Sequence, residues 1–257
     1  MQSQLLSSFN TIRHIFTTRL DGVSSIPYHS NNLAFHVGDK QNDVIENHIQ
    51  LAHKLDYDLN KLVHMRQIHS DKIVIIDSEH SFTSPPECDA IITNKKSIPL
   101  MVMTADCTPV ILYDKVHQVV AAVHAGRAGA FGAIVSKTVK KMQSHFSSEP
   151  SDIYAVLGPS IHNCCYEIGK DIVYEAHEQG FEYAVSTRND HYYLDVNRII
   201  KRQLITASVP EEHIEDLSLC TSCQNEVFFS YRADEQQTGR MAGVIMLADV
   251  HAGTELL

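Results

Sequence analysis

Short runs of apolar and β-branched residues recur along the chain between turn residues, a pattern that predicts β-strands. The uninterrupted apolar run VVAAV, within residues 118–123, indicates a strand covered on both faces. Over residues 62–77 the apolar runs LVHM and KIVII flank RQIHSD, which predicts a strand, a turn that carries a histidine, and a second strand. Further strands are predicted at residues 13–18, 89–93, 99–104, 109–113, 153–157 and 241–247.

Apolar residues at helical spacing predict helices elsewhere in the chain. They cover residues 42–55, 129–146, 170–179 and 196–207. Strand pairs with interspersed helices favour an α+β fold with mixed β-sheets and flanking helices over a doubly wound fold. Because no internal repeat and no Pro/Gly/Ser-rich linker interrupts the pattern, we expect residues 1–257 to form a single layered domain. The phosphate-binding patterns GxGxxG and GxxxxGK[ST] are absent from the sequence.

Composition and charge narrow the function classes. The chain has 21 Lys and Arg against 31 Asp and Glu, with no block of like charges. A nucleic acid polymer is therefore not expected as a partner, because no basic stripe could release phosphate counterions. We expect no membrane association and a cytoplasmic location, because no long apolar stretch occurs and the first twelve residues lack Lys and Arg. In that compartment the six cysteines are expected to be thiols or metal ligands.

Three segments place a metal-capable side chain where a predicted strand ends. They are RQIHSD with His69, TADCTPV with Cys107 and VVAAVHAG with His124. Two histidines and one cysteine make a three-ligand zinc set whose fourth position is open to water or substrate. The small residues after His124 leave room for another molecule to approach. The alternative is a buried cysteine and two ordinary histidines.

The remaining cysteines offer a competing metal hypothesis. Cys220-x-x-Cys223 is a metal or redox spacing, but the sequence shows neither a second such pair nor a thioredoxin context. Cys164 and Cys165 are adjacent, and we do not expect both to point easily into one tetrahedral site. We therefore interpret these four cysteines as structural thiols.

Several polar residues in loop-like contexts are candidates to bind a small anion or substrate. Arg127, directly after HAG, is the best placed of them. Taken singly, each arginine is equally consistent with a solvated charge or an ion pair. The candidates are Arg19, Asn32, His36, Arg127, Arg232 and Arg240.

Ordered segments across residues 13–247 resemble the bacterial laccase-domain family. They are FTTR, GVS, PY, NL, HVGD, QIHS, ADCTP, VHAG, LGPSI, YEIG, FFSYR and TGR. The resemblance implies that His69, Cys107 and His124 are zinc ligands. The family usually continues VHAG with Trp-Arg-Gly, whereas this chain has Arg127, Ala128 and Gly129. The arginine is therefore displaced by one position, which changes the direction of its side chain.

The family was once described as polyphenol oxidase and is now described as purine nucleoside phosphorylase with adenosine deaminase activity. The resemblance implies a zinc enzyme that cleaves adenosine, inosine, guanosine or methylthioadenosine with phosphate and deaminates adenosine. Deamination needs a water acidified by zinc and a proton carrier, for which Asp106 and His36 are candidates. Phosphorolysis needs arginine or backbone donors for phosphate.

The same residues also fit other functions. Cys107 with His69 or His124 also fits a Cys–His hydrolase acting on an amide such as a cell-wall peptide. Copper-dependent oxidation of phenols is less favoured, because one cluster of two histidines and a cysteine lacks the many His-x-His ligands of a multicopper centre. A non-catalytic binding protein is the third alternative. The sequence does not predict an oligomeric state.

Overall fold

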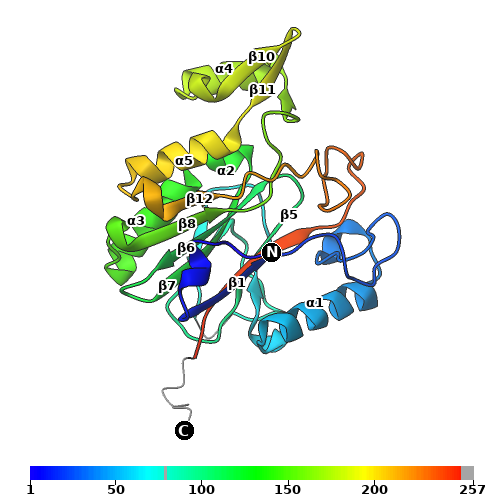
Figure 1. Cartoon of the computed structure of the whole chain (residues 1–257), viewed down its shortest axis with the longest axis vertical. Helices are drawn as coiled ribbons and strands as arrows, with labels where there is room; N and C mark the ends of the chain where they lie inside the picture. The colour runs from blue at the N-terminus through cyan, green and yellow to red at the C-terminus, as the bar shows by residue number, and fades with distance from the viewer. Residues whose placement is uncertain (78–79, 250–257) are drawn as a thin grey trace.

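The computed structural model describes residues 1–77 and 80–249. Within these residues the strands form a four-stranded, a six-stranded and a small three-stranded sheet (Figure 1). The predicted α+β class with mixed sheets and flanking helices is confirmed. In the same part of the chain, no helix is both long and apolar enough to cross a membrane. The extent of the single domain, residues 1–257, stays a prediction, because its last eight residues lie outside the described ranges.

The four-stranded sheet has the order β1-β13-β5-β2, formed by β1 (Ile12–Phe16), β13 (Met241–Leu247), β5 (Leu100–Thr104) and β2 (Val63–His64). The six-stranded sheet has the order β12-β8-β6-β7-β4-β3, formed by β12 (Ile214–Asp216), β8 (Ile153–Leu157), β6 (Thr108–Asp114), β7 (Val119–Ala125), β4 (Ala90–Thr93) and β3 (Ile73–Ile75). The small sheet has the order β10-β11-β9, formed by β10 (Val185–Arg188), β11 (His191–Leu194) and β9 (Glu167–Ile168).

The α-helices are α1 (Gln41–Leu55), α2 (Arg127–Phe131), α3 (Ile134–Phe146), α4 (Lys170–Glu178) and α5 (Val196–Thr206). Short 3-10 helices link these elements, namely η1 (Leu6–Ser8), η2 (Phe35–Val37), η3 (Leu59–Lys61), η4 (Pro150–Asp152), η5 (Glu182–Ala184) and η6 (Glu211–His213). The helices predicted at residues 42–55, 170–179 and 196–207 therefore match α1, α4 and α5 to within one residue at each end.

The two larger sheets pack face to face, and helices cover their outer faces. Along β6, Leu112 points toward α3 and α5, whereas its neighbour Ile111 packs against Val102 of the other sheet. Met101 of β5 faces the opposite way and packs with Leu51 of α1. Side chains alternate between faces along a strand, so a strand covered on both faces is apolar throughout. This layering explains the continuous apolar runs, and it is visible in Figure 1.

Two predicted elements differ in detail from the structure. The strands predicted within residues 62–77 do not pair with each other, because β2 pairs in parallel with β5 and β3 pairs in parallel with β4. The helix predicted at residues 129–146 is divided into α2 and α3 at Ala133, whose φ is 57°. Hydrophobic periodicity continues across this break, so the sequence pattern did not indicate it.

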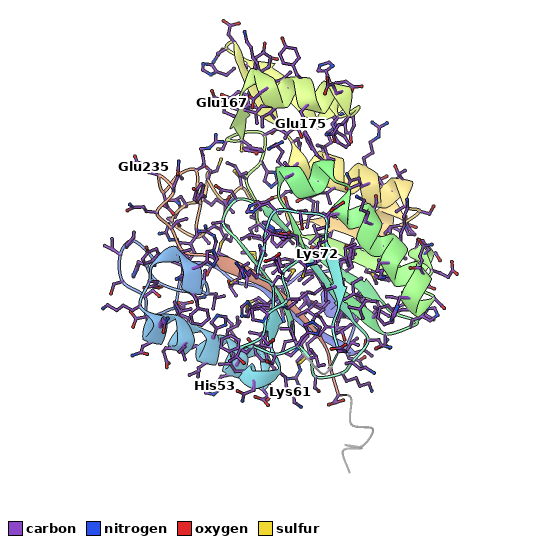
Figure 2. All side chains as sticks on the ribbon, turned by 180° about the vertical axis from the view of Figure 1, so that it is seen from behind. His53, Lys61, Lys72, Glu167, Glu175 and Glu235 are labelled. Atoms are coloured by element: carbon purple, nitrogen blue, oxygen red, sulfur yellow. The ribbon has the colours of Figure 1, made fainter. Side chains whose placement is uncertain are left out.

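The small sheet and α4 project from the layered body (Figure 1). The sequence pattern predicted α4 but not β9, β10 or β11, which are short and are exposed or only half-buried at most positions. Glu167 and Glu175 mark this projection in Figure 2. Glu175 forms an ion pair with Arg127 at the start of α2, which connects the projection to the layered body.

Candidate active site

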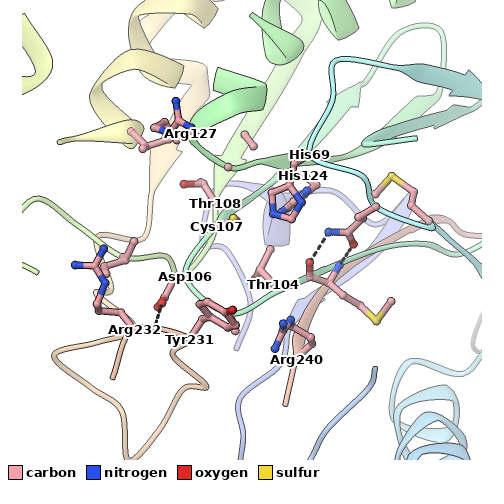
Figure 3. A pocket seen from close by; sticks show the side chains of 18 of the residues that line it. His69, Thr104, Asp106, Cys107, Thr108, His124, Arg127, Tyr231, Arg232 and Arg240 are labelled. Carbon is pink, nitrogen blue, oxygen red and sulfur yellow. Dashed lines mark hydrogen bonds between the residues drawn. The ribbon is translucent and has the colours of Figure 1, made fainter. Parts of the chain in front are cut away.

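His69, Cys107 and His124 meet at one point, although they come from three separate segments (Figure 3). His69 lies in the loop between β2 and β3, Cys107 directly precedes β6, and His124 lies in β7. Their candidate ligand atoms all lie within 4.8 Å of one another. His124 is only 3 % exposed, whereas His69 is exposed, so the cluster opens to solvent on one side. The three residues that the sequence singled out for chemistry are therefore brought together.

The pairing of β6 with β7 explains half of this arrangement. Pro109 lies opposite His124, so Cys107 sits beside the segment that follows the end of β7. A Cβ added at Gly126 would lie 2.8 Å from the Cys107 Sγ, closer than real Cβ contacts. Glycine at position 126 is therefore required by the close approach of the thiol.

Asp89 organises the other half of the cluster. Its Oδ1 lies 2.8 Å from the His124 Nδ1 and 3.0 Å from the backbone nitrogen of His69. Its Oδ2 accepts hydrogen bonds from the Ser70 backbone nitrogen at 2.7 Å and the Ser70 hydroxyl at 2.8 Å. One buried carboxylate thus orients the His124 ring and anchors the loop that carries His69. Sequence reasoning missed Asp89 because it is a single acidic residue at the start of a strand.

The pKa values of Asp89, Cys107 and His124 depend on one another. Burial of Asp89 opposes its ionisation, but hydrogen bonds from His124 and Ser70 outweigh this effect and lower its pKa to about 2. Burial likewise opposes ionisation of Cys107 and His124. Their mutual attraction nevertheless lowers the pKa of Cys107 and raises that of His124. A hydrogen bond from His69 to the thiolate and one from the His124 imidazole to the Asp89 carboxylate add to this effect.

The donor set fits a metal ion. Two imidazoles and a thiolate are ligands that zinc accepts in catalytic sites. A metal-bound histidine commonly donates its other ring nitrogen to a carboxylate, as His124 does to Asp89. A copper ion also accepts this donor set. The cluster therefore offers three candidate ligands and, on the exposed His69 side, room for a further one.

A cavity of about 640 Å³ opens over the cluster. This volume lies within the range of about 300–1,000 Å³ that is usual for small-molecule sites. The phenol ring of Tyr166 and the side chain of Met103 contribute apolar surface to its wall. Arginines also line the cavity, namely Arg66, Arg127, Arg232 and Arg240. The cavity therefore combines metal-capable ligands, apolar walls and positive charge in a protein whose net charge is −10.

The four arginines differ in whether a carboxylate already forms an ion pair with them. Arg127 forms an ion pair with Glu175, and Arg66 lies 3.8 Å from Glu87. Within residues 1–77 and 80–249, Arg232 and Arg240 form no ion pair with a carboxylate. The Arg240 guanidinium donates to the backbone oxygens of Thr238 and Gly239, and burial lowers its pKa. Arg232 and Arg240 therefore offer the unneutralised positive charge of the cavity.

Two of the predicted substrate-binding residues do not line the cavity. The Arg19 guanidinium is held by the backbone oxygens of His29 and Asn225 and by Asp234. The Asn32 side chain is fully buried, and its Oδ1 accepts a hydrogen bond from the Arg240 backbone nitrogen at 2.9 Å. These contacts give Arg19 a structural role, whereas Asn32 supports an arginine of the cavity.

His36 and Asp106, the candidate proton carriers, both line the cavity. The Asp106 carboxylate accepts a hydrogen bond from the Thr221 hydroxyl at 2.6 Å. It accepts another from the Arg232 backbone nitrogen at 2.7 Å (Figure 3). Both of its oxygens are therefore engaged in holding the cavity wall. Because both oxygens accept hydrogen bonds, a structural role for Asp106 is favoured over proton transfer.

Known proteins share the sequence of this chain over most of its length. A family model described as multi-copper polyphenol oxidoreductase laccase matches residues 13–248. A purine nucleoside phosphorylase of Corynebacterium glutamicum is 37 % identical over 237 residues, covering 92 % of this chain and 94 % of that protein. The purine nucleoside phosphorylase YlmD of Bacillus subtilis is 33 % identical over 240 residues, covering 90 % of this chain and 86 % of that protein.

Solved structures share the fold. The crystal structure of the Bacillus licheniformis hypothetical protein YfiH matches with a TM-score of 0.88 and 33 % identity, covering 93 % of each chain. YlmD from Geobacillus stearothermophilus matches with a TM-score of 0.88 and 30 % identity, covering 94 % of this chain and 93 % of that chain. The resemblance noted in the sequence is thereby confirmed, and this chain belongs to the laccase-like family whose relatives include proteins named purine nucleoside phosphorylases.

Proposed function

We propose that this protein is a zinc-dependent purine nucleoside phosphorylase that also deaminates adenosine. Its substrates would be adenosine, inosine, guanosine or methylthioadenosine, together with phosphate. The observation that carries the proposal is the cluster of His69, Cys107 and His124, supported by Asp89, at the wall of a cavity that also holds two unneutralised arginines. The names of the relatives support the phosphorylase activity.

Each part of the cavity has a role in this proposal. Arg232 and Arg240 would bind phosphate, because a guanidinium offers paired donors to an oxyanion. The aromatic rings of Tyr166 and Tyr231 would contact the purine. In phosphorolysis a phosphate oxygen forms a bond to C1′ of the ribose while the bond from C1′ to the purine nitrogen breaks. The electron pair of the broken bond leaves with the purine, which then takes up a proton.

His69, Cys107 and His124 would hold the zinc ion. When bound, zinc supplies Lewis-acid chemistry and acidifies water, which deamination requires. The Asp89 carboxylate accepts a hydrogen bond from the Nδ1–H of His124. The Nε2 of the neutral ring therefore stays free to act as a ligand. Asp89 also fixes the main chain at His69 and Ser70, so the position of the exposed histidine depends on the same carboxylate.

A second candidate function uses the same residues as a thiol enzyme. Cys107, His124 and Asp89 form a line of nucleophile, base and orienting carboxylate, which is the arrangement of Cys–His hydrolases. The substrate would be an amide such as that of a cell-wall peptide. Under this hypothesis a metal-free enzyme is active, and alkylation of Cys107 abolishes the activity.

Copper-dependent oxidation of phenols is a third hypothesis, consistent with the description of the family model. Among the described residues, the groups of His, Cys, Asp and Glu spaced to hold a metal are this cluster and a cluster of four cysteines. Neither group is rich in the histidines of a multicopper centre. We therefore favour zinc at the cavity.

Elemental analysis combined with a nucleoside assay tests the proposal. Purified protein is incubated with inosine and phosphate, or with adenosine alone, and the products are separated by chromatography. We expect phosphate-dependent release of hypoxanthine from inosine, conversion of adenosine to inosine, and zinc in the purified protein. Cys107→Ala should lose both activities and the metal of the cavity.

The matched control is Cys88→Ala, which removes a buried cysteine outside the cavity. It should retain both activities. An active metal-free enzyme that iodoacetamide inactivates would instead support the hydrolase. Copper with oxidation of phenols would support the oxidase.

A further inference from the structure

Four cysteines outside the cavity form a second cluster. Cys164 and Cys165 lie in the segment between β8 and β9, and Cys220 and Cys223 lie in the turn that follows β12. The four Sγ atoms all lie within 4.8 Å of one another. The sequence pattern favoured structural thiols at these positions and did not predict that the adjacent pair would point easily into one site. The structure brings both adjacent thiols to the Cys220-x-x-Cys223 turn.

The distances suit one metal ion rather than a disulfide. The Cys223 Sγ lies 3.5 Å from the Cys164 Sγ and 3.3 Å from the Cys165 Sγ. Zinc–sulfur bonds of about 2.3 Å place tetrahedral sulfurs about 3.8 Å apart, and no two sulfurs on one ion can exceed about 4.6 Å. A disulfide requires about 2.05 Å. Shifts of a few tenths of an ångström would bring the four sulfurs to the separations of a single tetrahedral site.

Main-chain hydrogen bonds hold the two segments side by side. The Ser160 nitrogen donates to the Leu219 oxygen at 3.1 Å, and the Thr221 nitrogen donates to the Ser160 oxygen at 3.0 Å. The site is thus preformed by the chain rather than assembled from mobile side chains.

We propose that Cys164, Cys165, Cys220 and Cys223 bind a structural zinc ion, separate from the metal at the cavity. Four cysteine thiolates complete the tetrahedral coordination of zinc, so no position stays open for substrate. The ligands come from two segments that are distant in the sequence, so the ion would cross-link them. Binding would release the protons of the thiols to solvent, with no oxidant or reductant required.

The cluster lies next to the wall of the cavity. The Cys165 oxygen accepts a hydrogen bond from the Arg232 guanidinium at 3.4 Å, and the Thr221 hydroxyl donates to Asp106 at 2.6 Å. The proposed ion would therefore stabilise the segments that support Arg232 and Asp106. This makes the four cysteines positioning residues, not catalytic residues.

Native mass spectrometry of the full chain tests the proposal by counting bound zinc. We expect about two zinc ions on the wild-type protein, and about one each on Cys107→Ala and on the double variant Cys164→Ser/Cys223→Ser. Cys164 and Cys223 are exposed, so serine at these positions leaves the packed core intact. Cys88→Ala is the matched control and should keep both ions.

Cobalt substitution supplies a second readout. Thiolate-to-cobalt charge transfer absorbs strongly in the near ultraviolet, and most of that absorbance should vanish in the double variant but persist in Cys107→Ala. The proposal is overturned if the double variant binds as much metal as the wild-type protein. It is also overturned if the intact mass shows the loss of two hydrogens of a disulfide among these cysteines. Zinc that persists in Cys107→Ala but not in the double variant supports this site even where the proposed activity fails.

Discussion

The Nδ1 of His124 lies 2.8 Å from the Oδ1 of Asp89, and both side chains are buried. The same carboxylate binds the main chain of the loop that carries His69. Two of the three proposed metal ligands therefore depend on one residue that binds no metal itself. A substitution of Asp89 therefore tests how the cluster is held together without changing any proposed metal ligand.

Replacing Asp89 with asparagine keeps the shape of the side chain and removes its charge. We expect zinc affinity and kcat/KM to fall roughly 10- to 100-fold, because the His124 ring loses its charged acceptor. Competition with a chromophoric chelator measures the affinity. Asp114→Asn is the control, because Asp114 is also buried and lies 3.0 Å from the His117 Nδ1, away from the cavity. Equal effects of the two substitutions would contradict this role for Asp89.

Arg240→Ala should separate phosphorolysis from deamination. Loss of a charged hydrogen-bond donor should raise the KM for phosphate roughly 10- to 100-fold, while deamination, which uses water, changes little. Arg240→Lys should restore little, because an ammonium lacks the planar pair of donors. Steady-state kinetics of both reactions measure the effect.

Comparison among the arginines provides the control for that experiment. Arg127→Ala should affect the phosphate KM less than Arg240→Ala, because Arg127 already pairs with Glu175. Arg19→Ala should lower stability without separating the two reactions, since Arg19 lies outside the cavity wall. A selective loss of phosphorolysis in Arg127→Ala alone would identify that residue as the phosphate ligand instead.

His48 should make the folded state sensitive to acid. Burial disfavours its charged form and lowers its pKa to about 4, despite a hydrogen bond to the Leu33 oxygen. The unfolded chain binds a proton near pH 6.5, so the contribution of neutral His48 to stability is lost as pH falls from about 6.5 to 4. The free energy of unfolding should fall between pH 7 and pH 4.5, and His48→Gln should make that fall smaller by about 2 kcal/mol.

Urea unfolding in the presence of a chelator at these two pH values measures that difference without interference from bound metal. His53→Gln is the control, because His53 lies on the same helix with an exposed side chain. An unchanged pH dependence in His48→Gln would show that folding does not lower the pKa of this histidine.

Gly126→Ala should disrupt the metal cluster without removing a ligand. The new Cβ would lie 2.8 Å from the Cys107 Sγ, so the thiol or the backbone must move. We expect lower zinc occupancy and loss of most of the activity, measured on the purified protein. Ala128→Ser adds one heavy atom at an exposed position two residues away and should retain both. Full occupancy in Gly126→Ala would show that the site does not need this close approach.

The secondary structure was largely predictable because local patterns report it directly. The helices α1, α4 and α5 and the strand β13 match their predicted ranges to within one residue. The break at Ala133 was not predictable, because one residue with a φ of 57° leaves the hydrophobic period intact. The pairing partners of β2 and β3 were also beyond local patterns, since each strand pairs with a strand that comes later in the sequence.

By itself the sequence determined the layered α+β class, because burial on both faces of a strand requires an apolar residue at nearly every position. Together with the family resemblance, it also singled out His69, Cys107 and His124. The tertiary structure decided what surrounds them. Asp89 reaches His124, Glu175 neutralises Arg127, and four cysteines from two segments converge. Hydrogen bonds and metal coordination act over a few ångströms, so only the folded arrangement of distant segments determines which polar groups become partners.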